Sequence, residues 1–199
     1  ERRRAEAAEA MLQVGQAISS SLEPRRILQT VVDEVARLFP VDRSAVLLFD
    51  AEREFGRIAA EHYPPGREPA PIFRVPLASD AVLSRVLEQK EGVFFEDVAV
   101  EQGAREWGSF WKVRQPRSLL VVPLIVRDEV TGVIMLESLV ECRRFSQEEI
   151  QQCQLIANMA ATAIENARLY DEVWAFSRQL ELRVEERTRE LRRERDRVQ

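Results

Sequence analysis

The stretch SLLVVPLIVRDEVTGVIMLES, residues 118–138, decides the fold of this chain. Its two apolar, β-branched runs, 118–126 and 130–138, flank a tight polar turn at Arg127-Asp128-Glu129, which predicts a pair of antiparallel strands. Shorter apolar runs at 44–49, 56–62, 72–75 and 92–95 predict further strands upstream. Helical patterns do not alternate regularly with these runs. The sequence therefore predicts an antiparallel sheet with helices packed on it, an α+β fold.

Two helices before the hairpin are specified by their ends. Pro24 suits the first turn of a helix, an apolar stripe follows it, and Pro40 ends it. Asp80 is a suitable N-cap for a second helix, whose apolar face carries Val82, Leu83, Val86 and Leu87.

A long helix is predicted to begin near residue 146. Ser146 and Glu149 form a capping-box pattern, and Phe145 and Ile150 flank it as a hydrophobic staple. Neither Pro nor Gly occurs from there to Gln199, so roughly 54 residues can run about 80 Å as one helix. Most helices of globular domains are much shorter, so the second half is expected to need a partner.

Residues 1–22 are predicted to form an N-terminal connector helix. Small or apolar residues recur there at the 3-4-3-4 spacing of a coiled-coil seam: Ala8, Met11, Gly15, Ile18 and Leu22. Gly15 weakens this pattern.

The composition places the chain among ordinary α/β proteins and excludes several function classes. Its net charge of −5, with no Lys/Arg stripe free of acidic neighbours, argues against a nucleic-acid-binding surface. The longest apolar run, Leu119 to Val126, is far shorter than the roughly 20 residues of a membrane span. Cys142 and Cys153 form no disulfide framework or metal spacing. We expect a cytoplasmic fragment of a larger protein, because the chain begins without Met or a secretory signal and ends inside a charged helix.

Four blocks in order resemble the GAF domain family: SLLVVPL (118–124), TGVIML (131–136), FSQEE (145–149), and Ile156-Ala continuing to AIENARLY (163–170). The resemblance covers about residues 8–170. It implies a five- or six-stranded antiparallel sheet with the terminal helices on one face and a small-molecule pocket on the other. GAF domains include cyclic-nucleotide sensors, bilin photoreceptors, haem sensors and many members without a known ligand, so the fold does not settle the function.

Past Tyr170 the chain is similar to the signalling helices that couple GAF domains to an output domain, and ERTREL (186–191) resembles the block that often precedes the phosphoacceptor helices of histidine kinases. The spacing of apolar residues independently predicts an adjustable coiled-coil seam. The predicted domains are a connector helix 1–22, a sensory domain 23–168 and a signalling coiled coil 169–199 leading to an absent output domain. The predicted homodimer interface consists of Met11, Ile18, Leu22, Val173, Phe176, Leu180, Val184, Leu191 and Val198.

An aromatic segment before the hairpin is the candidate pocket wall. Trp107, Phe110 and Trp111 recur at i, i+3 and i+4, so a short helix presents them together, and the resemblance places this segment beside the GAF ligand cavity. A hydrophobic lid that completes the core is the alternative. The predicted pocket consists of Trp107, Phe110, Trp111, Arg74, Leu120, Val122 and Glu137, although the pattern of the strand leaves open which of its faces meets the pocket.

Other GAF activities lack their residues in this sequence. The position that the resemblance gives to a bilin-attaching Cys reads Arg105-Glu106-Trp107, and Glu137-Ser138-Leu139 stands where cyclic-nucleotide binders carry Asn-Lys. His62 is the single histidine and offers little for a metal or catalytic site. Neither cysteine lies in the region that carries the catalytic thiols of GAF-type methionine-sulfoxide reductases.

The sequence thus predicts a sensory domain of a signalling protein, with a histidine kinase or a diguanylate cyclase as the linked output. No catalytic residue, cofactor, metal or nucleic acid is predicted for this chain, and no membrane contact. The expected partners are a second copy of the chain, the linked domains and an unidentified small molecule. The alternatives are a ligandless dimerisation spacer and, less favoured, the thiol-dependent reductase.

Overall fold

The computed structural model describes residues 11–18, 20–64, 66, 74–101 and 108–198, with side chains described as far as residue 189. A helical segment, 11–18, comes first. The elements after it are α2 (Pro24–Leu38), β1 (Arg43–Phe49), β2 (Phe55–His62), β3 (Arg74–Pro76), α3 (Ala81–Gln89), β4 (Val93–Phe95), α4 (Ser109–Arg114), β5 (Ser118–Val126), β6 (Glu129–Ser138) and α5 (Gln147–Val198).

The strands form one six-stranded antiparallel sheet in the order β3-β2-β1-β6-β5-β4, which confirms the α+β prediction. The hairpin of β5 and β6 pairs Ser118 with Ser138 at its open end and Val126 with Glu129 at its turn. Strand β6 therefore begins one residue earlier than predicted. The turn residues Arg127 and Asp128 both have positive φ, 49° and 67°, the geometry that matches a two-residue turn to the twist of its strands.

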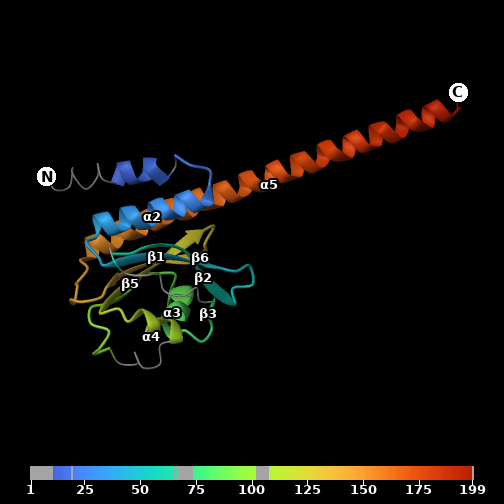
Figure 1. Ribbon diagram of the computed structural model, residues 1–199. Coiled ribbons are helices and arrows are strands. Elements are labelled where there is room, and N and C mark those ends of the chain that lie inside the picture. Colours follow the sequence, from blue (N-terminus) through green and yellow to red (C-terminus); the bar gives the residue numbers. More distant parts are fainter. Residues whose placement is uncertain (1–10, 19, 65, 67–73, 102–107, 199) are drawn as a thin grey trace.

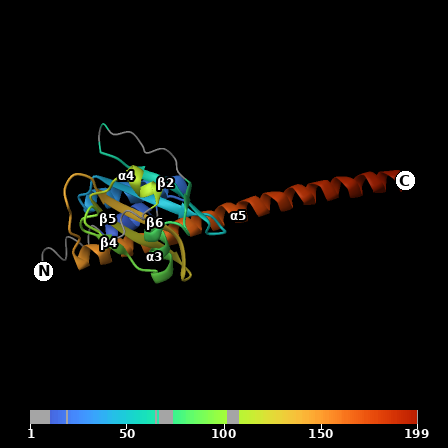
Figure 2. The same ribbon diagram turned by 90° about the horizontal axis from the view of Figure 1, so that it is seen from below.

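Helices cover the two faces of the sheet differently. Figure 1 shows α2 and α5 side by side along one face, whereas α3 and α4 lie on the other, and Figure 2 shows the same arrangement from below. Each face has its own apolar core. We call the side of the sheet that α3 and α4 cover, together with the core between them and the sheet, the α3–α4 face. It occupies the side on which the resemblance places a ligand pocket.

The beginning of α5 follows the sequence prediction. The backbone N–H of Ser146 donates to Glu149 Oε2 over 2.8 Å, and the backbone N–H of Glu149 donates to Ser146 Oγ over 3.2 Å, a reciprocal capping box. Phe145 and Ile150 both pack on the core under α2 and α5. From this cap α5 runs for 52 residues and projects far beyond the sheet (Figure 1).

The N-terminal connector differs from the prediction. Helix 11–18 ends well before residue 22, and after the turn that follows it the chain reverses into α2. In Figure 1 helix 11–18 runs in the same direction as α5 along the helix layer, and Val14 and Ile18 are fully buried in the core of the chain itself. Ile18 is therefore covered within the chain rather than exposed on a seam. Ala8 lies outside the described residues.

Among the helices that the structure describes, none combines the length and the apolar character that crossing a bilayer requires.

Candidate functional site

The α3–α4 face is mostly filled by apolar side chains. Phe110 and Trp111 of α4 are both buried there, with their rings edge to face at 4.8 Å. Trp107 lies outside the described residues. A cavity of about 60 Å³ remains on this face beside Asp80, Gly108 and Phe110. That volume matches about two water molecules, far below the several hundred Å³ of a drug-sized ligand site.

Asp80 joins α3 to α4. Its Oδ1 accepts hydrogen bonds from the backbone N–H of Val82 (3.2 Å) and Leu83 (3.0 Å), as the predicted N-cap requires, and from Trp111 Nε1 (2.9 Å). Its Oδ2 is buried and has no hydrogen-bond partner among the residues that the structure describes. Burial raises the pKa of Asp80, and the three hydrogen bonds oppose this rise without cancelling it.

A buried cluster of four charged residues occupies another part of the same face. Glu137 of β6 accepts from Arg43 Nε of β1 (2.7 Å) and from Arg114 Nε of α4 (2.5 Å), and Arg114 also pairs with Glu61 of β2. Arg43 Nη2 donates to the carbonyl of Arg114 over 2.8 Å. Two arginines and two glutamates leave this charge cluster electrically neutral. It fixes the end of α4 to three strands.

In the charge cluster, the neighbouring carboxylates raise the pKa of Arg114 by more than burial lowers it. Burial lowers the pKa of Arg114, but the neighbouring carboxylates of Glu137 and Glu61 raise it further, so its pKa lies above the ordinary value for arginine. Arg114 Nη2 is buried without a hydrogen-bond partner in the part of the chain that is described. Its guanidinium carbon lies 5.2 Å from the centre of the Phe110 ring. The interior of this face is therefore not wholly apolar.

Of the remaining predicted pocket residues, Glu137 is buried in the charge cluster and Arg74 lies at the rim. The exposed Arg74 side chain stacks on the Phe55 ring, 3.8 Å from its centre, and lies 3.6 Å from Asp50. Leu120 and Val122 were predicted on the pocket side, but they pack in the core under α2 and α5. Their neighbours Leu119 and Val121 face α3 and α4 instead. The strand is apolar on both faces, so its alternation carried no information about direction.

Sequence reasoning missed Arg43, Glu61 and Arg114 as functional candidates, and gave Asp80 only a capping role. A glutamate at position 137, inside an otherwise apolar strand, was the available signal, because a buried carboxylate requires a cationic or hydrogen-bonding partner. The identity of that partner depends on β1, β2 and α4 meeting in space. No local pattern encodes that meeting.

The profile of the GAF domain matches residues 23–164. This chain belongs to the GAF domain family. A segment of the circadian input-output histidine kinase CikA of Thermosynechococcus vestitus is 29% identical over 195 residues, 90% of this chain and 26% of that protein. The CikA of Synechococcus elongatus is 27% identical with the same coverage. The chain thus spans about a quarter of the length of these curated relatives.

Solved GAF structures confirm the fold. The GAF domain of an Acinetobacter phosphoenolpyruvate-protein phosphotransferase superposes with a TM-score of 0.69 at 18% identity, covering 84% of this chain and 98% of that one. The free methionine-R-sulfoxide reductase of Neisseria meningitidis superposes with a TM-score of 0.67 at 17% identity, covering 84% and 93%. At such identities the likeness concerns the fold alone. The family and the kinase relatives together give this GAF domain a sensory role in signal transduction.

Neither cysteine of this GAF domain belongs to the apolar core of the α3–α4 face. Cys153 is fully buried in the core under α2 and α5, and burial raises the pKa of its thiol to about 12. Cys142 follows β6, is exposed, and accepts a hydrogen bond from Arg117 Nε over 3.1 Å. His62, at the end of β2, contacts Asp33 of α2 over 2.8 Å at the surface. Within the described ranges no group of metal-binding side chains comes together.

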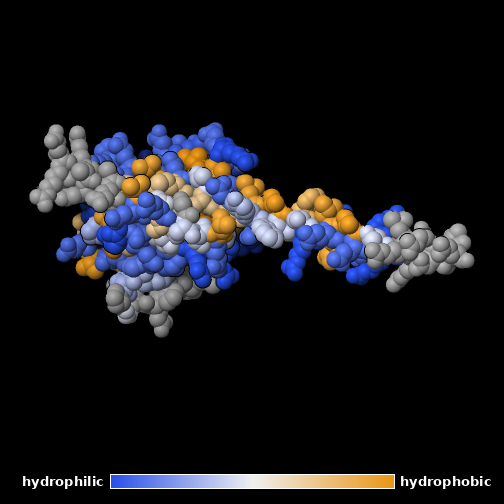
Figure 3. Space-filling view, turned by 90° about the horizontal axis from the view of Figure 1, so that it is seen from above, coloured by the Kyte–Doolittle hydropathy of each residue, from blue (hydrophilic) through white to orange (hydrophobic). Residues whose placement is uncertain are grey.

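The projecting half of α5 carries the clearest exposed apolar surface of the domain. Val173 is 66% exposed, Phe176 68%, Leu180 53% and Val184 58%, and all were predicted for a dimer seam. Figure 3, which looks onto the helix layer, shows hydrophobic surface along this part of the helix. The side chains of Leu191 and Val198 lie outside the described residues.

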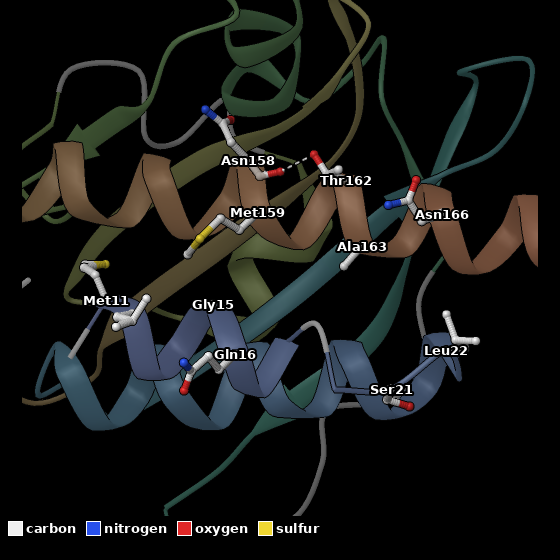
Figure 4. A pocket seen from close by; sticks show the side chains of 11 residues that line it. Met11, Gly15, Gln16, Ser21, Leu22, Asn158, Met159, Thr162, Ala163 and Asn166 are labelled. Carbon is white, nitrogen blue, oxygen red and sulfur yellow. Dashed lines mark hydrogen bonds between the residues drawn. The ribbon is translucent and has the colours of Figure 1, made fainter. Parts of the chain in front are cut away.

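A groove of about 650 Å³ runs between helix 11–18 and the first half of α5. Figure 4 shows Met11 and Gly15 along one side of it, with Met159 and Ala163 on the other. Met11 is half-buried, and Leu22 at its end is exposed. Gly15 permits the close approach, since a Cβ there would lie 3.3 Å from Met159 Sδ.

Proposed function

We propose that this GAF domain relays a signal from its α3–α4 face to an output domain linked after α5. The observation that carries the proposal is the single helix α5, whose first half is part of the domain core and whose second half leaves the domain (Figure 1). A change in the tilt or rotation of the first half therefore moves the second half, because no Pro or Gly interrupts the helix. The resemblance to histidine kinases makes a kinase our preferred output.

A physical connection between the α3–α4 face and α5 supports the relay. Strand β5 contacts α3 with Leu119 and Val121, and contacts α5 with Leu120 and Val122. Gln154 Nε2 of α5 also donates to the carbonyl of Pro123 in β5 over 3.0 Å. A repacking around α3 or α4 thus reaches α5 through one strand.

We propose that two copies pair through the projecting part of α5. Val173, Phe176, Leu180 and Val184 would otherwise leave a continuous apolar stripe in water, and burying it in a coiled coil stabilises the pair by about 25 cal/mol for each Å² covered. The 3-4-4 step from Val173 to Val184 departs from a strict heptad and keeps the seam adjustable. A relay needs two arrangements that differ by only a few kcal/mol.

A ligandless dimerisation spacer is the second candidate, and the small size of the cavity favours it. A volume of about 60 Å³ holds no nucleotide or tetrapyrrole without rearrangement. The buried charge cluster and the unpaired Asp80 Oδ2 favour the binding module instead, because a spacer has no need of polar groups inside. The thiol-dependent reductase predicts turnover that is lost on replacing Cys142 or Cys153. Cys142 is exposed and Cys153 is buried in the opposite core, so neither is part of the α3–α4 core.

Sedimentation equilibrium of the chain tests the pairing. We expect a dimer for the wild type and a monomer for the double substitution Val173→Glu and Phe176→Glu, since like charges then face each other on the seam. The matched control is Glu172→Gln with Asp171→Asn, which changes charge beside the stripe and leaves the apolar residues in place. A wild-type chain that remains monomeric at the highest soluble concentration would rule out the homodimeric relay.

A further inference from the structure

One carboxylate oxygen on the α3–α4 face is buried without a donor. Asp80 is 1% exposed, and its Oδ1 accepts all three of the hydrogen bonds described above. Its Oδ2 receives none from the described part of the chain. A buried acceptor of this kind costs about 1–3 kcal/mol when unsatisfied, and more when it is charged. A donor from outside the chain would remove that cost.

The unpaired oxygen lies against Gly108. A Cβ built on Gly108 would lie 2.8 Å from Asp80 Oδ2, and both residues line the cavity of about 60 Å³. The backbone of Gly108, at φ −55° and ψ 165°, is one that any residue can adopt. Glycine at this position is therefore explained by the close approach of the Asp80 carboxylate, which a side chain would push away.

The surrounding chemistry restricts what can enter. Among the described residues that line the cavity, Arg74 is the other charged one, and its guanidinium is exposed, stacked on Phe55 and 3.6 Å from Asp50. Its charge is thus partly neutralised and screened by solvent. The volume equals that of about two water molecules, which suits an ammonium group and excludes a larger cation.

We propose that this cavity binds the ammonium group of a small primary amine, which donates a hydrogen bond to Asp80 Oδ2. The inference rests on the proposed sensory role and names the ligand chemistry of the α3–α4 face. A cation here would also offset the burial that raises the pKa of Asp80. Because Asp80 caps α3 and holds Trp111 of α4, occupancy of the cavity acts on both helices.

Nuclear magnetic resonance of the indole N–H groups tests the proposal on the whole chain. Trp111 Nε1 donates to Asp80 Oδ1, so its resonance reports directly on this carboxylate, and Trp111→Phe identifies it among the three tryptophans. We expect methylammonium chloride to shift this resonance in a saturable manner. Tetramethylammonium chloride at equal ionic strength has the same charge but no N–H and too large a volume, so it should leave the resonance unchanged.

Two variants separate the proposed contact from general effects. Asp80→Asn retains an N-cap oxygen for α3 and Trp111 but places an NH₂ donor where Oδ2 was, and Gly108→Ala puts a methyl group directly against Oδ2. Each should weaken methylammonium binding at least tenfold while the thermal unfolding midpoint shows that the domain remains folded. Ser79→Ala, an exposed residue on the rim of the cavity, is the matched control and should bind as the wild type does.

Three results would overturn the proposal: no saturable shift with methylammonium, an equal shift with tetramethylammonium, or undiminished binding by both variants. The first is also the result expected if the cavity holds only water. Failure here leaves the pairing of α5 untouched, because sedimentation measures that independently. Conversely, a monomeric chain that still binds methylammonium through Asp80 would refute the relay and keep the site.

Discussion

Glu137 is the centre of the charge cluster, because it accepts from both Arg43 and Arg114. Replacing it with Gln leaves two arginines without their shared carboxylate in a buried site. Removing one partner of a buried ion pair typically lowers the free energy of unfolding by about 3–5 kcal/mol. We expect a loss of this size for Glu137→Gln in urea denaturation.

The matched control for that experiment is Glu96→Gln. Glu96 lies 3.6 Å from Arg144 in an exposed pair, and such pairs contribute at most about 1 kcal/mol. Equal losses for the two variants would show that the charge cluster does not hold α4 to the sheet.

The cysteines should differ sharply in reactivity. Burial raises the pKa of Cys153 to about 12, so its thiol stays protonated and covered at pH 8, whereas Cys142 is exposed. We expect a thiol reagent to modify one cysteine rapidly in the native domain and the second only after unfolding. Cys142→Ser should abolish the rapid phase. Rapid modification of Cys153 in the native domain would contradict its placement on the buried face of α5.

At the residue scale, the sequence predicted a short helix that presents Phe110 and Trp111 together, and the Asp80 cap, because these depend on spacing along one short segment. It did not predict the partners of Glu137, since Arg43 and Arg114 are 94 and 23 residues away along the chain. It also misplaced Leu120 and Val122, because a strand buried on both faces shows no polar alternation.

At the scale of elements, the first turn of α5 is the most precisely specified feature. The Ser146 hydroxyl accepts from the backbone of Glu149, and loss of such an N-cap costs about 1 kcal/mol. Ser146→Ala should therefore lower the free energy of unfolding by about this amount in chemical denaturation. Thr162→Ala, on the exposed side of the same helix, serves as the control and should change stability much less. An unchanged free energy of unfolding in Ser146→Ala would mean that the capping box does not stabilise the start of α5.

The same turn makes the stability of the domain depend on pH. Partial burial raises the pKa of Glu149, but the Ser146 backbone and Arg143 lower it by more, so its pKa lies below the ordinary value of 4.5. The ionised form is thus favoured in the folded state. Its contribution is complete above about pH 4.5 and disappears as the pH falls through the lowered folded-state pKa. Glu149→Gln should be less stable than the wild type at pH 7, and the difference should shrink as the pH falls through the folded-state pKa.

The sequence predicted where the helices begin, because short local motifs mark those positions. It did not predict which surfaces the helices pack against. Pro24, Asp80 and the capping box fixed the beginnings of α2, α3 and α5. The helical spacing of residues 11–22 was equally suited to a seam between two chains and to a face packed on the same chain, and Ile18 takes the second arrangement. Periodicity identifies an apolar face but not what covers it.

At the scale of the whole molecule, the domain consists of a sheet with two different helical layers and a helix that belongs to one layer and leaves it (Figure 1). The α3–α4 face contains the buried charge cluster and Asp80, and the opposite layer contains the start of α5. A signal that begins at the α3–α4 face must therefore cross the sheet to reach α5. Strand β5, buried on both faces, is the path that we propose.

The central claim is that α5 pairs with a second copy and moves when the α3–α4 face is disturbed. Spin labels at Glu181, introduced as Glu181→Cys in a Cys142→Ser background, place a probe on the exposed helix of each copy. Pulsed dipolar spectroscopy should then give a narrow inter-chain distance distribution, as expected for helix axes about 8–10 Å apart. Trp111→Phe, which removes the hydrogen bond to Asp80, should shift that distribution. The absence of any inter-chain distance, or a distribution identical in both proteins, would contradict the relay.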